Sequence, residues 1–223
     1  MQFFIDDSVK SRLNDVKISL IHYTTIQVGA SPQMIKGRLQ LFQEALFLDL
    51  QEKQVSDFSG ISEWRDIFKK TGYNPSRYRP SNEALYRRVQ KQQFLQSHHS
   101  ATDINNFFSM EYAIPIGIYD TSKIKGDTVT IAIGQEGETY SGLNGRDIHA
   151  EGLLVAKDEQ GIFGSPYVDS VRTAVTESTT DALQIVFHQP SISDDNAKKL
   201  TESLAKMFTQ VHGGDHKVTN YTI

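Results

Sequence analysis

Hydrophobic residues follow a helical spacing through much of the first half of the chain and a strand-like spacing through most of the second half. An early exception is residues 16–28, VKISLIHYTTIQV, whose β-branched and aromatic residues predict a strand. From Ser31-Pro32 to Gln51, apolar residues recur every three or four positions, which predicts an amphipathic helix. The same spacing predicts helices over 62–70, 81–92 (with Ser81 as the N-cap) and 103–113.

After Pro115 the pattern changes to short apolar runs separated by glycine, aspartate and other turn residues. These runs predict strands at IGIYD, TVTIAIG, ETYSG, GLLVAKD, GIFG and TAVTESTTDALQIVF. Strands this short and closely spaced are typical of a sandwich or barrel-like core. A helix over 195–211, ended by Gly213-Gly214, and a last strand over 216–223 complete the expected elements.

The composition indicates a soluble globular protein, because 38% of the 223 residues are apolar and 22% are charged. The chain has no cysteine, which excludes disulfides, thiolate zinc sites and a cysteine nucleophile. No apolar run approaches the roughly 20 residues of a membrane span, and the start MQFFIDDSVK is unlike a secretory signal. We therefore expect a cytoplasmic protein that does not engage a membrane.

Charge is distributed unevenly along the chain. The formal net charge is −4, yet residues 65–91 hold eight basic and two acidic residues, so the remainder carries −10. Within this segment, YNPSRYRPSNEALYRRVQ (73–90) contains four arginines and three tyrosines. Such clustering indicates a face for a polyanion. The alternative is an ordinary solvated helix surface on which Glu83 and Arg87, four residues apart, pair on the exposed side.

Familiar catalytic signatures are absent: the sequence has no P-loop, no GxGxxG after a strand, no HExxH and no GxSxG. Adjacent His98 and His99 diverge in either regular structure, and His212 and His216 fit a helix C-terminus better than a metal site. We expect no metal and no cofactor. Hydroxyls of the threonine-rich stretch 173–180 would line both faces of a strand, where they could form a polar pocket or lie exposed.

Two longer motifs carry a resemblance. RYRPSNEALYRRVQK and DINNFFSMEYAIPIGIYDTSKIKG, followed in order by GETY, LLVAKD and TAVTESTTDAL, are similar to the B3/B4 domain of the bacterial phenylalanyl-tRNA synthetase β subunit. The resemblance covers roughly residues 70–190. It implies an α+β fold with a mostly antiparallel, β-sandwich-like core and flanking helices. On this basis 71–223 would form the B3/B4-like domain and 1–70 an α/β extension packed on it as one unit.

In the synthetase this domain hydrolyses tyrosine wrongly attached to the phenylalanine tRNA, so the resemblance implies tRNA as the partner and deacylation in trans as the activity. Asn106 with Thr176 or Thr179 would orient the terminal ribose or the attacking water, and Glu111 or Asp120 would be a weaker candidate for general base. The RNA would be bound by basic and aromatic side chains of one segment: Arg77, Arg79, Arg87, Arg88, Lys91, Tyr78 and Tyr86.

The pocket positions implied by the resemblance are Pro115, Gly117, Tyr119 and Ile185. Asn106 and Pro115 match the family, whereas Gly117 stands where the synthetase has a histidine. Ile185 falls near the glutamate that recognises the tyrosine hydroxyl, and an apolar residue cannot accept that hydrogen bond. Tyrosine-specific editing by the synthetase's own scheme is therefore disfavoured.

Two other functions stay open at this point. The same scaffold could bind tRNA, or an amino-acid-like small ligand, without chemistry. It could also be a small-ligand domain whose arginines are structural, with Arg87 or Arg88 folded onto buried carboxylates such as Glu111 or Asp120.

Overall fold

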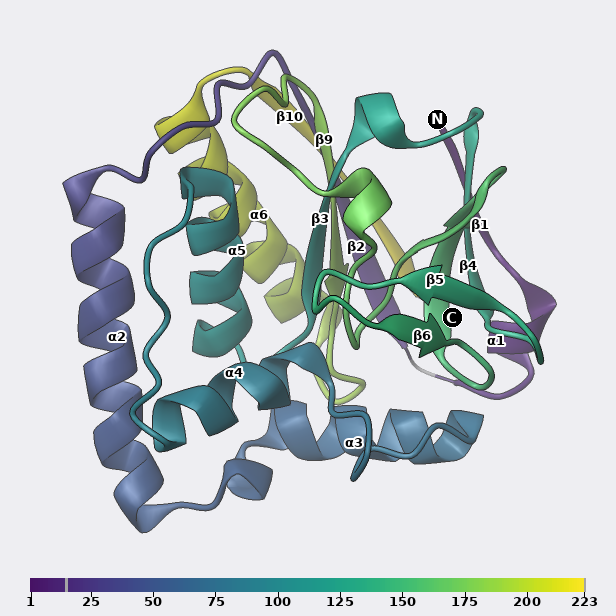
Figure 1. The fold of residues 1–223 in the computed structure, drawn as a ribbon, viewed down its shortest axis with the longest axis horizontal. Coiled ribbons are helices and arrows are strands. Elements are labelled where there is room, and N and C mark those ends of the chain that lie inside the picture. The colour runs from purple at the N-terminus through teal and green to yellow at the C-terminus, as the bar shows by residue number, and fades with distance from the viewer. Residues whose placement is uncertain (15, 223) are drawn as a thin grey trace.

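The computed structural model describes residues 1–14 and 16–222, and it has three layers (Figure 1). The middle layer is a sheet, here called the central sheet, with strand order β10 (Asp215–Thr222), β2 (Lys17–Thr24), β9 (Ala182–Phe187), β3 (Ile116–Asp120). The outer sheet has the order β1 (Gln2–Ile5), β4 (Thr128–Ile133), β7 (Leu154–Asp158), β8 (Gly161–Gly164). A small hairpin, β5 (Thr139–Ser141) with β6 (Asp147–His149), lies beside them.

Helices form the third layer, on the face of the central sheet away from the outer sheet (Figure 1). They are α2 (Gln33–Glu52), α4 (Ser81–Gln90), α5 (Ser100–Glu111) and α6 (Asp194–His212), while α3 (Ser59–Thr71) runs along one end of the layers. The described residues also contain short helices, which are α1 (Asp7–Lys10) and the 3-10 turns η1 (Val55–Asp57), η2 (Thr121–Lys123) and η3 (Val171–Thr173). The α+β class is confirmed.

The sheets are mostly antiparallel, as expected; within the described residues, only β1 and β4 pair in parallel. Residues 1–70 contribute to both sheets, because β1 is an edge of the outer sheet and β2 lies between β9 and β10. The division of the chain at residue 70 stays a prediction.

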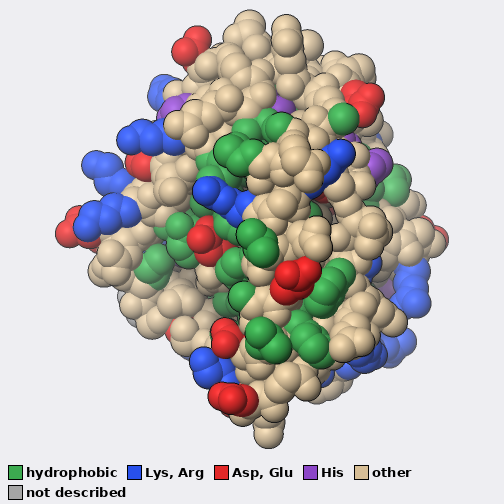
Figure 2. Space-filling model, turned by 90° about the vertical axis from the view of Figure 1, so that its left-hand side faces the viewer, with side chains coloured by type: hydrophobic (Ala, Val, Ile, Leu, Met, Phe, Trp, Pro, Cys, Tyr) green, Lys and Arg blue, Asp and Glu red, His purple; other side chains and the backbone are tan. Residues whose placement is uncertain are grey.

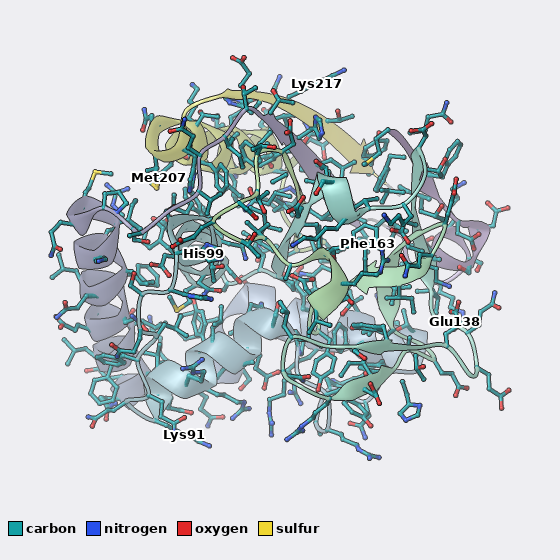
Figure 3. All side chains as sticks on the ribbon, turned by 45° about the horizontal axis from the view of Figure 1, so that its top comes forward. Lys91, His99, Glu138, Phe163, Met207 and Lys217 are labelled. Carbon is teal, nitrogen blue, oxygen red and sulfur yellow. The ribbon has the colours of Figure 1, made fainter. Side chains whose placement is uncertain are left out.

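Alternation along the central strands sends side chains into two cores. On β9, Val186 faces the helices, while Ile185 and Phe187 face the outer sheet, and all three are buried. Helix α3 joins the core between the sheets through Trp64, whose ring meets Phe187 edge-on at 5.9 Å. Figure 3 places Phe163 of β8 in this strand-rich half and Lys91 beyond the outer end of α4.

Most predicted elements are confirmed to within a few residues: the strand over 16–28 is β2, and the helices over 31–51, 62–70, 81–92, 103–113 and 195–211 are α2 to α6. Five of the six runs predicted as strands after Pro115 are strands over most of their length. Hairpin strand β6 and the N-terminal β1 and α1 were not predicted. The last predicted strand is confirmed as β10, and its final residue, Ile223, lies outside the described residues.

Two predictions about local structure are wrong. The run 173–187 is a strand only from Ala182, because residues up to Thr173 form a 3-10 turn and the following hydroxyls bond to nearby groups instead of to a sheet. Ser81 is the first helical residue of α4 and not its cap; Pro80 precedes it without a side-chain cap.

Figure 2 shows the face at which α2 stands, with hydrophobic side chains breaking the polar surface. On α2 the exposed ones are Met34, Leu41 and Leu48, seven residues apart. Among the helices of residues 1–14 and 16–222, none combines the length and apolar character needed to cross a membrane.

Candidate functional site

A cleft of about 590 Å³ lies between α4, α5, the β5–β6 loop and the segment after β8. We call it the cationic cleft. Six of its lining side chains are basic: Arg77, Arg79, Arg87, Arg88, Lys91 and Arg146. The predicted basic segment therefore forms one wall of a cleft. The β5–β6 hairpin, which is distant in sequence, adds Arg146 to the lining.

The cleft changes character from its rim to its interior. The rim residues Arg77, Arg79, Arg88, Lys91 and Arg146 are exposed. The interior lining is neutral and buried at Asn105, Ser109 and Ile116, with Asn106 partly exposed. Positive charge is thus concentrated where a ligand would enter.

A buried chain of hydrogen bonds fixes the part of α5 that lines the cleft. Tyr23 donates to the Gln184 side chain at 2.9 Å, and Gln184 Nε2 donates to Asn105 Oδ1 at 2.9 Å. Asn105 Nδ2 in turn donates to the Ile116 carbonyl oxygen at 2.9 Å. Its neighbour Asn106 is therefore held on a rigid helix, with its own side chain reaching the cleft.

The buried carboxylate of Glu83 contacts arginines from α3, from α4 and from the segment before α4. Its side chain is 0% exposed and accepts from Arg65 Nη1 at 2.8 Å and from Arg87 Nε at 2.8 Å. Arg79 Nε lies 3.9 Å from the same carboxylate. The predicted Glu83–Arg87 pair exists, but it is not on the exposed side of the helix. Arg87 is therefore held by a buried carboxylate, although by Glu83 and not by Glu111 or Asp120.

Three cations at the cleft are available to a ligand. Across residues 1–14 and 16–222, Arg88, Lys91 and Arg146 form no salt bridge. All three are exposed, so their charges meet solvent at the rim. Arg77 differs, since its guanidinium lies 5.0 Å from the Tyr78 ring centre.

The aromatic rings of the segment fall into two groups. Tyr78 stacks on Tyr73 with 4.9 Å between ring centres and meets Tyr167 edge-on at 5.7 Å. Tyr78 and Tyr167 are partly exposed, and Tyr167 lines the cleft. Tyr86 is buried at 2% exposure and donates to the Met110 carbonyl oxygen, so its ring cannot stack on a base.

One carboxylate lines the cleft within the described part of the chain, Asp169. The Tyr119 hydroxyl donates to Asp169 Oδ1 at 2.7 Å. Burial raises the pKa of Asp169 to about 7. Hydrogen bonds from Tyr119 and from the backbone of Ser165 and Ile118 favour its ionised form and partly oppose this rise. Burial also raises the pKa of Tyr119 far above its usual range, so that hydroxyl stays protonated.

Gly117 and Gly164 make room for the Tyr119 ring. A Cβ at either glycine would collide with the Tyr119 hydroxyl, and at Gly117 it would also come within 3.0 Å of Asp169 Oδ1. The place where the synthetase resemblance expects a histidine is thus occupied by the Tyr119–Asp169 pair.

The four pocket positions lie behind the cleft and not in its lining. Tyr119 and Ile185 are 0% exposed in the core between the sheets, and Ile185 pairs with Gly117 across β3 and β9. The Pro115 carbonyl oxygen accepts from the Phe187 N–H at 3.1 Å. Of the four, Tyr119 contacts a side chain of the cleft lining, that of Asp169.

The threonines and Asp120 form a separate cluster. Thr179 donates to Asp120 Oδ2 at 2.7 Å, and Asp120 also accepts from Ser122 and lies 3.6 Å from Lys123 Nζ. These hydrogen bonds and the Lys123 charge outweigh burial and lower the pKa of Asp120. Thr176 is exposed and bonds Ser178. The cationic cleft is not lined by Thr176, Thr179 or Asp120, although all three are predicted catalytic residues.

Glu111 also lies apart from Asn106. It lines a different hollow, together with Tyr112 and Gly60, on the α2 side of α5. Burial raises its pKa while Arg38 opposes the shift. Of the five predicted catalytic side chains, Asn106 is the one that the structure places in the cationic cleft.

Sequence reasoning missed Asp169, Arg146, Tyr167 and Asn105. The nearest hint for Asp169 was its position after the GIFG run, where a loop between short strands is a usual place for functional residues. Nothing in the spacing links it to Tyr119, which is fifty positions away.

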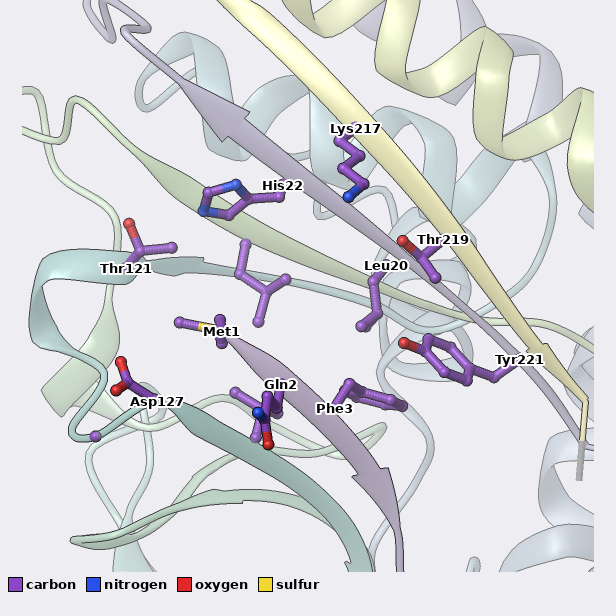
Figure 4. A pocket seen from close by; sticks show the side chains of 13 residues that line it. Met1, Gln2, Phe3, Leu20, His22, Thr121, Asp127, Lys217, Thr219 and Tyr221 are labelled. Carbon is purple, nitrogen blue, oxygen red and sulfur yellow. The ribbon is translucent and has the colours of Figure 1, made fainter.

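A second pocket, of about 480 Å³, opens between the two sheets (Figure 4). Leu20, Val129 and Leu183 form its apolar part, and His22, Asp127 and Lys217 are at its polar edge. It contains none of the predicted site residues. No group of three or more His, Asp or Glu side chains suited to a metal ion occurs in residues 1–14 and 16–222.

Comparison with known proteins decides the family. Residues 63–211 match the B3/4 domain. The chain belongs to this family. The resemblance drawn from the two motifs is therefore confirmed, and the match spans α3 to α6, including every element around the cationic cleft.

Relatives include both free-standing and larger proteins. The chain is 38% identical to the uncharacterized protein YhzB of Bacillus subtilis (strain 168) over 222 residues, which cover 98% of each chain. It is 32% identical over 106 residues to the phenylalanine–tRNA ligase β subunit of Paramagnetospirillum magneticum, covering 44% of this chain and 12% of that subunit. Among solved structures, an N-terminal fragment of the phenylalanyl-tRNA synthetase β-subunit from Pyrococcus horikoshii aligns with the whole chain and 54% of its own, with a TM-score of 0.49 and 12% identity.

Proposed function

We propose that this protein binds the 3′ end of an aminoacylated tRNA in the cationic cleft and hydrolyses the ester of a wrongly attached amino acid in trans, in the cytoplasm. The observation that carries the proposal is the cleft itself, which the family-matched elements enclose and six basic side chains line. Related ligase subunits are named for a tRNA, and we extend that partner to this chain.

The rim suits a polynucleotide backbone. Arg88, Lys91 and Arg146 are exposed and outside the described salt bridges, so they can neutralise phosphates and release counterions. Tyr167 is partly exposed in the lining and presents a ring on which an unpaired terminal base can stack.

The chemistry required is modest. An aminoacyl ester is activated, so its hydrolysis needs a positioned water and donors for the oxyanion that forms on the carbonyl oxygen. The Asn106 side-chain amide supplies donors inside the cleft, and the hydrogen-bonded chain through Asn105 keeps that turn of α5 in place. Asn106 is therefore the residue to which we assign the oxyanion or the water.

A deacylation time course tests this function. The full chain is incubated with a panel of correctly and incorrectly charged tRNAs, and the remaining ester is measured. We expect one misacylated tRNA to lose its amino acid much faster than in buffer, and Asn106→Ala to slow that loss by about 100-fold. Asn196→Ala, an exposed asparagine on α6, is the control and should leave the rate unchanged. If every ester survives as it does in buffer, the protein is not a deacylase.

One observation favours a second function, tRNA binding without chemistry. The Tyr119–Asp169 pair occupies the space beside Gly117 where the resemblance expects a histidine of the editing pocket. Saturable, salt-sensitive tRNA binding in the same samples, with every ester intact, would identify this function.

A further inference from the structure

The cationic cleft pairs many cations with one acid, in an ordered arrangement. Five of its six basic side chains are at the exposed rim, whereas Asp169 is only partly exposed and lines the cleft together with buried residues such as Ile116. A ligand complementary to this pattern is anionic along most of its length and cationic at the end that reaches Asp169.

The Asp169 carboxylate is held in place by hydrogen-bond donors, from Tyr119 and from the backbone of Ser165 and Ile118, and not by a cation. Its hydrogen bond from Tyr119 fixes its orientation, and Tyr119 is clamped between Gly117 and Gly164. Within residues 1–14 and 16–222, no other side chain donates to Asp169 and no cation forms a salt bridge with it. The carboxylate therefore retains capacity for a charged donor from a ligand.

We propose that Asp169 binds the free α-ammonium group of the amino acid at the tRNA 3′ end, so that the cleft selects aminoacylated ends over N-acylated or uncharged ones. The inference rests on the proposed function, since it names the substrate class for that same cleft. It assigns Asp169 to substrate recognition, with Tyr119 as the residue that positions it.

The chemistry of the ligand supports this assignment. The RNA end supplies phosphates for the rim, and an aminoacyl group adds one cation at its very tip. An ammonium–carboxylate contact in a partly desolvated site is a charge-assisted hydrogen bond, which is stronger than a neutral one. N-acylation removes the charge and leaves the partly desolvated carboxylate without its partner, which is costly.

The test measures binding to probes that cannot be hydrolysed. They are acceptor-stem minihelices ending in 3′-amino-3′-deoxyadenosine, which carries alanine in amide linkage, either with a free amine or N-acetylated. A third minihelix carries no amino acid. We expect the full chain at pH 7.5 to bind the free-amine probe about 10-fold more tightly than the other two. Asp169→Asn should remove the preference, so that the free-amine and acetylated probes bind it equally well.

Asp147→Asn is the matched control, because Asp147 is an exposed carboxylate on β6 outside the cleft lining. It should keep the preference. Equal affinity of the wild-type chain for the free-amine and acetylated probes would overturn the assignment while leaving RNA binding intact. Failure of all three probes to bind would overturn the assignment and the proposed function together. Because the probe comparison uses the wild-type chain, it holds even if Asp169→Asn fails to fold.

Discussion

Gly117 shows how a single residue determines which polar side chains this site contains. Its partner across the strands is Ile185, and its missing side chain leaves room for the Tyr119 hydroxyl. The Tyr119 hydroxyl in turn donates to Asp169, which lines the cleft. At the position where the resemblance leads us to expect a histidine, the absence of a side chain is here a condition for a different polar pair.

Gly117→Ala should destabilise the protein by about 1–3 kcal/mol, because its Cβ collides with the Tyr119 ring, which is fully buried and cannot move away. Chemical denaturation monitored by the fluorescence of Trp64 measures the change. The matched control is Gly37→Ala on α2, where a new Cβ meets no atom within 4 Å and should stabilise by about 0.5–1 kcal/mol. Equal effects of the two substitutions would contradict the crowding argument.

The site was predictable where its residues are close in sequence. Arg77, Arg88 and Lys91 fall within fifteen positions, so their density is visible without a structure. Asp169 and Arg146 reach the same cleft from other elements, and only the fold brings them there. Burial is equally invisible to spacing, which is why Tyr86 and Glu83 were expected at the surface.

At the scale of elements, α3 and α4 are joined by the buried Glu83. Glu83→Ala leaves Arg65, 22% exposed, without its carboxylate and should cost about 3 kcal/mol. Arg87→Ala should cost about 1 kcal/mol, because Arg87 is more exposed and Arg65 continues to pair with Glu83. Denaturant titrations of the two variants give the ordering, and a larger loss for Arg87→Ala would show that Arg65 is not the main partner.

The free cations of α4 and the hairpin should control RNA affinity. Arg88→Ala with Arg146→Ala removes two rim charges that have no salt bridge in the described chain, so tRNA affinity should fall and the slope of log K against log salt should flatten by about 2. Lys198→Ala with Lys199→Ala makes the same charge change on the exposed side of α6. Filter binding at several salt concentrations compares them, and equal slopes for the two double variants would place the RNA elsewhere.

Hydrophobic periodicity predicted most elements because each long helix and central strand buries one face. It failed where local hydrogen bonds decide the backbone, as in the turn where Thr179 Oγ1 accepts from the Thr176 N–H at 3.0 Å. It also missed β1, a four-residue edge strand whose parallel pairing with β4 joins residues more than a hundred positions apart. Such long-range pairing has no local signature.

At the scale of the whole molecule, the pH dependence of stability reflects two groups with opposite effects, the buried His188 and the partly exposed Asp169. A hydrogen bond of 2.7 Å joins His188 Nε2 and Ser19 Oγ. Burial lowers the pKa of His188 from 6.5 to about 4. The stabilisation from neutral His188 is complete above pH 6.5 and is lost as pH falls toward 4. Asp169 has a raised pKa, about 7 against 3.8, so its contribution is complete below pH 3.8 and is lost as pH rises through 7.

Between pH 7 and pH 4 these two effects oppose each other, each by about 3 kcal/mol at most. Single variants should therefore reveal slopes that the wild-type chain hides. His188→Gln removes the loss on acidification, so its free energy of unfolding should rise, relative to wild type, as pH falls from 7 to 4. Asp169→Asn should show the reverse. Urea titrations at pH 4, 5, 6 and 7 measure both, and parallel pH curves for the two variants would mean that neither group titrates as its burial requires.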